Sequence, residues 1–295
     1  MTPDFLCIGS VLWDMIGRTE SRMTPGADVA GTIQRLPGGV VMNIAVTLAR
    51  LNQRPALLTA IGRDPEGDEL MDRARAMGLV MHYVWRSATL STDRYMAIED
   101  DSGLIAAIAD AHSLEAAGDA ILRPLADGRL GSAQAPFAGR IVLDGNLTVD
   151  LLAEIARSPL FSAADLYVVP ASPGKADRLR PLMRHPRATL YVNLEEACIL
   201  GGARFSDSRS AAIALVAAGA TRVLVTDGAR DATDLHAGGE PLTRAARAVR
   251  AVRVTGAGDT FLAAHMVAES RGESPAEALA RAQDAAADHV AGETT

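Results

Sequence analysis

Six short apolar runs recur along this 295-residue chain, and longer segments with helical spacing of apolar residues lie between them. Runs of this length, bounded by turn residues, are typical of strands buried in a mostly parallel sheet. Segments such as 43–51 and 211–218 would supply the connecting helices, and a final helix is expected over 274–290. The alternation predicts an α/β fold with helices on both faces of the sheet, and we expect a single domain over residues 1–295. The predicted strands are Phe5–Gly9, Ala56–Ile61, Ile141–Leu143, Leu166–Val169, Leu190–Val192 and Val223–Thr226.

Two segments, about 12–36 and 92–110, interrupt this alternation because they are strand-like and have no helix between their strands. In the second, the turn at 100–103 separates two strand patterns and predicts a hairpin. These pieces could pair into a small sheet outside the main layer. Such a sheet is either a lid that excludes water from the ligand or an ordinary edge hairpin.

The sequence Thr255-Gly256-Ala257-Gly258-Asp259 precedes a segment, from Thr260 to about Glu269, that is predicted to be helical. Two glycines allow a tight turn with exposed amide groups, and the first turn of a helix binds anions. Asp259 beside such a site could accept the proton of an alcohol that attacks phosphorus. The alternative is a plain strand-to-helix turn with an acidic helix start. The chain has neither the Walker phosphate loop nor the Gly-x-Gly-x-x-Gly dinucleotide pattern.

Other polar residues follow the predicted strands, where ligands bind in parallel α/β sheets. Gly38 and Gly39 precede a helical segment that begins with Asn43, whose amide could bind substrate hydroxyls or merely cap the helix. Asn193 and Glu196 fit a capping box, although Glu196 could also help to hold Mg²⁺ through water. The remaining candidates are Asp14, Asp144, Asn146, Lys175, Thr226 and Gly228, of which Lys175 is either a phosphate contact or an ordinary exposed lysine.

Composition excludes several classes of partner. A net charge of -7 and a pI near 5.4 argue against binding to nucleic acid or to an anionic membrane. The two cysteines, Cys7 and Cys198, lie in apolar stretches and are expected to be buried thiols in a reducing cytoplasm. The six histidines have no metal-ligand spacing, and no run of 18 apolar residues occurs. We therefore expect a cytoplasmic protein with a small-molecule ligand.

Taken together, the Gly38-Gly39 element with Asn43, Asn193 with Glu196, Thr226 with Gly228, and the glycine turn at Asp259 resemble the ribokinase-like (PfkB) family of sugar and nucleoside kinases. The resemblance spans nearly the whole chain. It implies a three-layer α/β/α fold with a small β lid, and ATP-dependent, Mg²⁺-assisted phosphorylation of a primary hydroxyl. Within the family, the residues around Thr92, Asp110, Asp144 and Lys175 are most similar to those of pseudouridine kinases, which implies phosphorylation of the nucleoside 5′-hydroxyl.

The resemblance also implies a role for each motif residue. Asp259 is the catalytic base, and Gly256, Ala257 and Gly258 form the anion hole. The substrate would contact Asp14, Gly38, Gly39, Asn43, Thr92, Asp110 and Asn146. The nucleotide would contact Lys175, Asn193, Thr226, Gly228 and Thr255, with Glu196 near Mg²⁺.

Four points stay open at the level of sequence. Arg253 stands where many members have an acidic or amide residue, so the requirement for a monovalent cation is undecided. The acceptor could instead be a free sugar or sugar acid, such as ribose or 2-keto-3-deoxygluconate. A non-catalytic nucleoside or sugar sensor with the same fold is a further alternative. Finally, Leu104, Ile105 and Ile108 could give the lid an apolar face for a homodimer.

Overall fold

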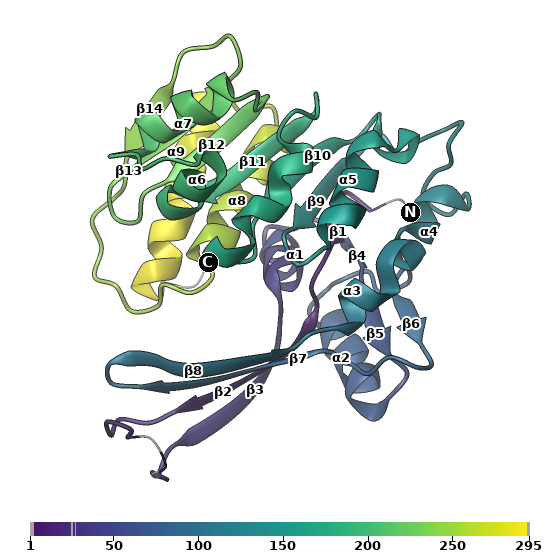
Figure 1. Ribbon diagram of the computed structural model, residues 1–295, viewed down its shortest axis with the longest axis vertical. Helices are drawn as coiled ribbons and strands as arrows, with labels where there is room; N and C mark the ends of the chain where they lie inside the picture. The colour runs from purple at the N-terminus through teal and green to yellow at the C-terminus, as the bar shows by residue number, and fades with distance from the viewer. Residues whose placement is uncertain (1–2, 25, 27, 294–295) are drawn as a thin grey trace.

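The computed structural model describes residues 3–24, 26 and 28–293, and an eight-stranded sheet forms its centre (Figure 1). The strand order is β14-β13-β12-β11-β10-β9-β1-β4. Neighbouring strands from β4 to β12 pair in parallel, and β13 and β14 are antiparallel. The predicted mostly parallel sheet is therefore confirmed. Its strands are β1 (Phe5–Ile8), β4 (Pro55–Leu58), β9 (Arg140–Asp144), β10 (Asp165–Val169), β11 (Ala188–Asn193), β12 (Arg222–Thr226), β13 (Asp231–His236) and β14 (Leu242–Ala245).

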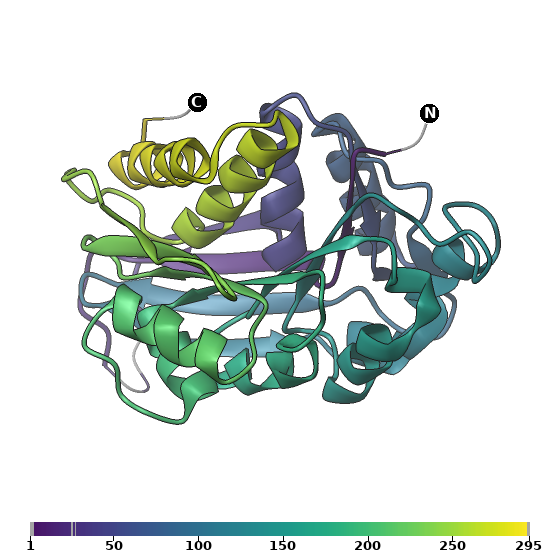
Figure 2. The ribbon, with the colours of Figure 1, turned by 90° about the horizontal axis from the view of Figure 1, so that it is seen from above.

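Helices cover both faces of this sheet, as Figure 2 shows, with α1, α8 and α9 above it and α5, α6 and α7 below. Strand β1 explains the two layers, because Phe5 and Cys7 join one apolar core and Leu6 and Ile8 join the other. The fold is therefore the expected three-layer α/β/α arrangement. The helices are α1 (Val40–Arg50), α2 (Pro65–Ala76), α3 (Ser113–Ala117), α4 (Arg123–Ala126), α5 (Val149–Arg157), α6 (Leu194–Gly201), α7 (Ser208–Ala217), α8 (Ala257–Ser270) and α9 (Pro275–Ala291), with 3-10 turns at Gly118–Leu122, Pro159–Phe161 and Pro173–Leu182.

Four predicted boundaries were wrong, one of them the start of α7, which begins at Ser208 and not at residue 211. The run Ala56–Ile61 is two strands, because the chain leaves the main sheet at Thr59 and β5 (Ala60–Gly62) pairs with β6 (Trp85–Ser87) in a separate sheet. Helix α1 begins at Val40, three residues earlier than expected, so Gly39 is its N-cap and Asn43 lies inside its first turns. Helix α8 begins at Ala257 and not at Thr260. In both helices a glycine with positive φ replaces the polar cap that marks a helix start in sequence.

The lid segments form a separate four-stranded sheet of order β3-β2-β7-β8, as expected. Strand β2 begins four residues after β1 ends, and β3 leads directly into α1, so this lid sheet starts from the carboxyl edge of the main sheet. Figure 1 shows it projecting beneath the main body. Residues 25 and 27, within the predicted lid segment 12–36, lie outside the described residues. The lid strands are β2 (Leu12–Arg18), β3 (Thr32–Gly38), β7 (Arg94–Asp100) and β8 (Gly103–Asp110).

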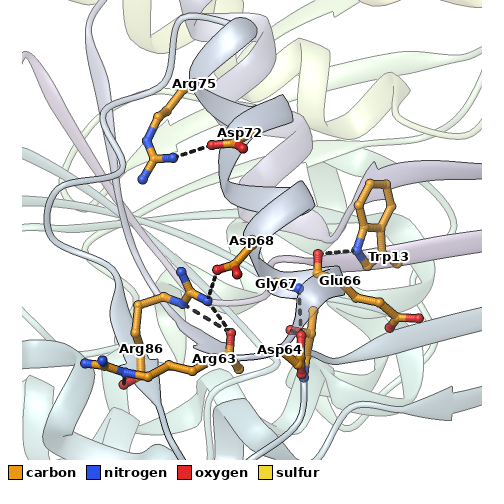
Figure 3. Close-up of polar contacts among 11 residues, drawn as sticks. Trp13, Arg63, Asp64, Glu66, Gly67, Asp68, Asp72, Arg75 and Arg86 are labelled. Carbon is orange, nitrogen blue, oxygen red and sulfur yellow. Dashed lines mark hydrogen bonds and ion pairs between the residues drawn. The ribbon is translucent and has the colours of Figure 1, made fainter.

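The base of the lid is attached to the first turn of α2. Trp13 is fully buried, and its indole Nε1 donates to the carbonyl of Glu66 at 3.0 Å (Figure 3). The Arg35 guanidinium stacks over the indole ring at 4.2 Å, and Arg94 pairs with the Glu66 carboxylate at 2.8 Å. These contacts join strands of the lid to the start of α2, so they fix the position of the base of the lid.

Two expectations from composition can be compared with the structure. Cys7 is buried, and burial together with the nearby Asp144 carboxylate raises the pKa of its thiol. Cys198, in α6, is only half-buried, so the expected burial of both thiols is wrong for this one. Among the helices described, none has the length and apolar character needed to cross a membrane.

Candidate active site

The N-terminus of α8 is an open anion-binding turn. Gly256 is the N-cap with φ of 87°, a conformation that favours glycine, and no side chain caps the helix. The Ala257 amide donates to the carbonyl of Val254 at 3.1 Å. In contrast, the amides of Gly258 and Asp259 have no acceptor among the residues that the structure covers. A Cβ at Gly258 would meet no atom within 4 Å, and Gly258 and Asp259 both line a cavity, so these two amides can reach a bound anion.

Asp259 lies in the first turn of α8, partly exposed toward a cavity. Burial raises the pKa of its carboxyl to about 7, and the charges of Asp144 and Glu196 act in the same direction. An interaction with the side chain of Asn43 lowers the pKa and opposes these effects. A carboxyl group with a pKa near neutrality can both take up and release a proton under physiological conditions.

A cavity of about 350 Å³ is lined by eight of the sequence-predicted residues. It lies where the carboxyl ends of β10, β11 and β12 meet the N-termini of α1 and α8. Its size suits a small-molecule ligand. The predicted residues that line it are Asn43, Asn193, Glu196, Thr226, Thr255, Gly256, Gly258 and Asp259.

Asn193 and Glu196 form a capping box at the start of α6. The backbone amide of Asn193 donates to Glu196 Oε2 at 2.8 Å, and the backbone amide of Glu196 donates to Asn193 Oδ1 at 2.9 Å. Burial raises the pKa of Glu196 to about 7. The interpretation of these residues as a capping box is therefore confirmed. It does not exclude a role of Glu196 near Mg²⁺, because its Oε1 accepts no hydrogen bond from any described residue and its side chain lines the cavity.

Mg²⁺ needs few protein ligands when a nucleotide supplies the others. Among the described residues no group of three or more histidine, cysteine or acidic side chains could hold a metal ion. Kinases usually bind Mg²⁺ through one or two carboxylates, several waters and the phosphates. One carboxylate with an open oxygen, Glu196, fits that pattern.

The lid contributes Asp14 beside the two glycines before α1. The Asp14 carboxylate fills the position that a side chain at Gly38 would occupy, and a side chain at Gly39 would collide with the carbonyl of Ser10. Burial raises the pKa of Asp14 to about 6. The glycines are thus required by close approach, and they bring a lid carboxylate next to the helix that carries Asn43.

The structure does not bring Thr92 and Asp110 close to Asp14 and the two glycines before α1. Thr92 is buried, and its amide and hydroxyl donate to the Asp64 carboxylate at 2.8 and 2.6 Å. Asp64 also caps α2 by accepting from the Gly67 amide (Figure 3). Asp110 is paired with Arg94, on the lid face opposite Asp14. The residue that shares the face of Asp14, directly across from it in β7, is Tyr95.

Asn146 and Lys175 contact one another, although they were predicted to bind different ligands. Lys175 Nζ donates to Asn146 Oδ1 at 2.7 Å, and both side chains are half-buried. Lys175 is therefore not an ordinary exposed lysine, because its ammonium group has a side-chain partner. Neither residue lines the cavity, and Gly228 also stands outside it on an exposed loop with φ of 56°.

Asp144 is a functional candidate whose role the sequence did not reveal. It is fully buried at the end of β9, where its two oxygens accept from the amides of Ser10 and Asn146, both at 2.9 Å. The carboxylate thereby holds together the loops that follow β1 and β9, and it contributes to the raised pKa of Asp259. Its place directly after a buried strand was the available signal.

Comparison with known proteins identifies the family. The model of the pfkB family of carbohydrate kinases matches residues 2–292. The chain belongs to this family. It is 32% identical to the "Uncharacterized sugar kinase YeiI" of Escherichia coli over 66% of this chain, an alignment that spans only about half (52%) of that relative. It is 28% identical to the pseudouridine kinase of Escherichia coli over 87% of this chain and 80% of that protein.

Solved structures agree with the fold. A carbohydrate kinase from Agrobacterium tumefaciens superimposes with a TM-score of 0.81 at 26% identity, covering 97% of this chain and 90% of that one. The ribokinase-like fold predicted from the motifs is thus confirmed. The chain carries the kinase domain of an ATP-dependent phosphotransferase that acts on a hydroxyl group.

Proposed function

We propose that this protein phosphorylates the 5′-hydroxyl of pseudouridine with ATP as the phosphoryl donor. The observation that carries the proposal is the position of Asp259, which has a raised pKa and lies beside the open amides at the start of α8. The similarity to the Escherichia coli pseudouridine kinase supports the choice of acceptor. Asp14 and Tyr95, on one face of the lid, supply a carboxylate and an aromatic ring suited to a nucleoside.

In this mechanism the acceptor hydroxyl donates a hydrogen bond to Asp259. Its oxygen attacks the γ-phosphorus of ATP, its proton passes to the Asp259 carboxylate, and the bond to the β-phosphate oxygen breaks to release ADP. The amides of Gly258 and Asp259 stabilise the charge on the transferred group. Bound Mg²⁺ would neutralise charge on the phosphates, with Glu196 holding it through water. Asn43, Asp14 and Gly39 orient the acceptor.

Residues around the nucleotide complete the proposal. Thr226, Thr255 and Asn193 line the cavity and are assigned to ATP. Lys175 and Asn146, which already contact one another, are assigned to the edge of the site where the acceptor meets the phosphates. We also propose that no monovalent cation is needed, because Arg253 places a permanent positive charge behind the glycine turn.

A panel of acceptors tests the substrate. ADP release is measured with pseudouridine, uridine, ribose and 2-keto-3-deoxygluconate, each at several concentrations, with ATP and Mg²⁺. We expect pseudouridine to give the highest kcat/KM. A higher value for ribose or the sugar acid would assign a sugar kinase instead, and binding of a nucleoside without any turnover would assign a sensor.

We further propose that two copies associate through the lid. Met96, Ile33 and Ile108 lie on the lid face opposite Asp14, and Ile33 and Ile108 are 78% and 68% exposed. Exposed apolar side chains of this size on a sheet face favour a protein contact. The mass in solution, measured by light scattering, tests this directly.

A further inference from the structure

A second cavity, of about 290 Å³, lies on the other side of the glycine turn from the active-site cavity. Its walls come from α1, the loop before α8, α8 itself and the end of α9. Two of the residues that line it, Arg253 and His289, contact one another. His289 has no part in the chemistry described above, and Arg253 enters it only as a fixed positive charge, yet both side chains lie within reach of the turn that binds the phosphoryl group.

His289 connects α9 to both sides of this turn. Its Nε2 lies 2.8 Å from the carbonyl oxygen of Thr255, immediately before Gly256. Its Nδ1 lies 2.9 Å from the Arg253 guanidinium and 3.1 Å from the hydroxyl of Thr260, immediately after Asp259. A side chain at Gly256 would come within 3.2 Å of the imidazole ring. The histidine therefore packs directly behind the anion-binding amides.

The partners of His289 determine the charge of its ring. Nε2 lies beside the Thr255 carbonyl, which is an acceptor, and 3.2 Å from Arg253 Nε, which is a donor, while a second guanidinium nitrogen of Arg253 lies 2.9 Å from Nδ1. A guanidinium that faces both ring nitrogens disfavours a charged imidazole, so the ring is neutral. Burial lowers the pKa of His289, and the positive charges of Arg253 and Arg50 lower it further. The hydrogen bond to Thr255 raises the pKa but does not outweigh these effects.

The loop that precedes α8 depends on these contacts because residues 246–254 have no helix or strand. The amides of Val252 and Arg253 donate to the carbonyl of Val290 at 2.8 and 3.1 Å, so the backbone already follows the last turn of α9. The side chain of His289 continues this attachment up to Thr255. On the other side of the turn, Thr260 donates to the carbonyl of Gly256 at 2.9 Å.

We infer that His289, oriented by Arg253, is a positioning residue that fixes the glycine turn in the conformation in which its amides bind the transferred phosphoryl group. The neutral imidazole acts as a rigid bridge between a cation and a backbone carbonyl. Anion-binding amides stabilise charge only when they are held in place before the reaction. A displacement of about 1 Å at such a site can cost on the order of 100-fold in rate.

This inference rests on phosphoryl transfer by the kinase domain and not on which acceptor is used. It predicts an effect on kcat that exceeds the effect on the KM of the acceptor, because the acceptor is held by Asn43 and the lid. It also predicts that the two side chains act together, so that loss of Arg253 disturbs the turn through His289.

The test compares His289→Ala, His289→Gln and Arg253→Ala with the double variant. Glutamine retains one donor and one acceptor and should recover most of the lost rate. We expect His289→Ala to lower kcat by about 10- to 100-fold with little change in acceptor KM. The double variant should be about as impaired as His289→Ala alone. Arg281→Ala, which removes an exposed arginine from the same helix, is the control and should behave as wild type.

Binding of MgADP with aluminium fluoride gives a second readout that requires no acceptor. His289→Ala should bind this complex at least tenfold more weakly than wild type while binding MgADP alone with similar affinity. Folded His289→Ala with wild-type kcat and wild-type binding would overturn the inference. Equal losses in the alanine and glutamine variants, matched by equal losses of thermal stability, would also overturn it, because the ring would then have only a packing role. A protein inactive with pseudouridine, yet showing the binding difference, would refute only the proposed acceptor.

Discussion

Replacing Asp259 by asparagine should inactivate the enzyme and at the same time stabilise the protein. The substitution keeps the size of the side chain but removes its ability to accept a proton. We expect kcat to fall by about 10²- to 10⁴-fold, the range for loss of general-base help. The affinity for ATP should stay nearly unchanged, because the amides and the cavity walls remain.

The stability effect follows from the pKa of the same carboxyl group. A rise from the ordinary value of 3.8 to about 7 corresponds to roughly 4 kcal/mol of preference for the protonated form in the folded protein. Solvent in the open cavity screens part of this, so we expect about 1–2 kcal/mol. Because the folded state holds the proton more tightly than the unfolded state, wild type loses stability as pH rises from about 4 to 7. The asparagine variant has no such proton to lose.

Thermal unfolding from pH 5 to 8.5, together with steady-state kinetics, measures both effects. The variant should exceed wild type in Tm by several degrees above pH 7 and by little at pH 5. Asp119→Asn, at an exposed aspartate, is the matched control and should change neither kcat nor Tm. Wild-type kcat in Asp259→Asn would refute the base assignment. A Tm difference that does not grow with pH would refute the argument from the buried charge.

Three further outcomes are expected. Asp14→Asn should raise the KM of the acceptor by about 10- to 100-fold with a smaller change in kcat, since a hydrogen bond to a charged group is lost; steady-state kinetics measures the split, and an unchanged KM would remove Asp14 from the site. Turnover should be the same in potassium, sodium or tetramethylammonium chloride, and tenfold activation by potassium would contradict a role of Arg253 as the built-in cation. Ile108→Asp should convert a wild-type dimer to monomers in light scattering, and a wild-type monomer would exclude association through the lid.

The elements that the sequence predicted well are those determined by local pattern. The six apolar runs lie in buried strands, and their apolar side chains join the two cores that cover the sheet. The capping box of Ser274 and Glu277 marks the start of α9, since both of its hydrogen bonds link residues three apart. Helices α1 and α8 began earlier than expected because their caps are glycines in unusual conformations, and a glycine in sequence gives no sign of its φ angle.

The lid residues could not be assigned from sequence because their roles depend on register between strands far apart in the chain. In β7, Arg94 lies on the face of Trp13 and packs toward α2, whereas Tyr95 lies across from Asp14 on the other face. A shift of the strand register by one residue would exchange the faces on which these two side chains lie. Thr92, three residues before Tyr95, was assigned to substrate from the resemblance to pseudouridine kinases, but its hydroxyl donates to the Asp64 carboxylate. The chemistry of this kinase therefore follows from one local turn, while the choice of acceptor depends on which face of a strand each lid side chain occupies.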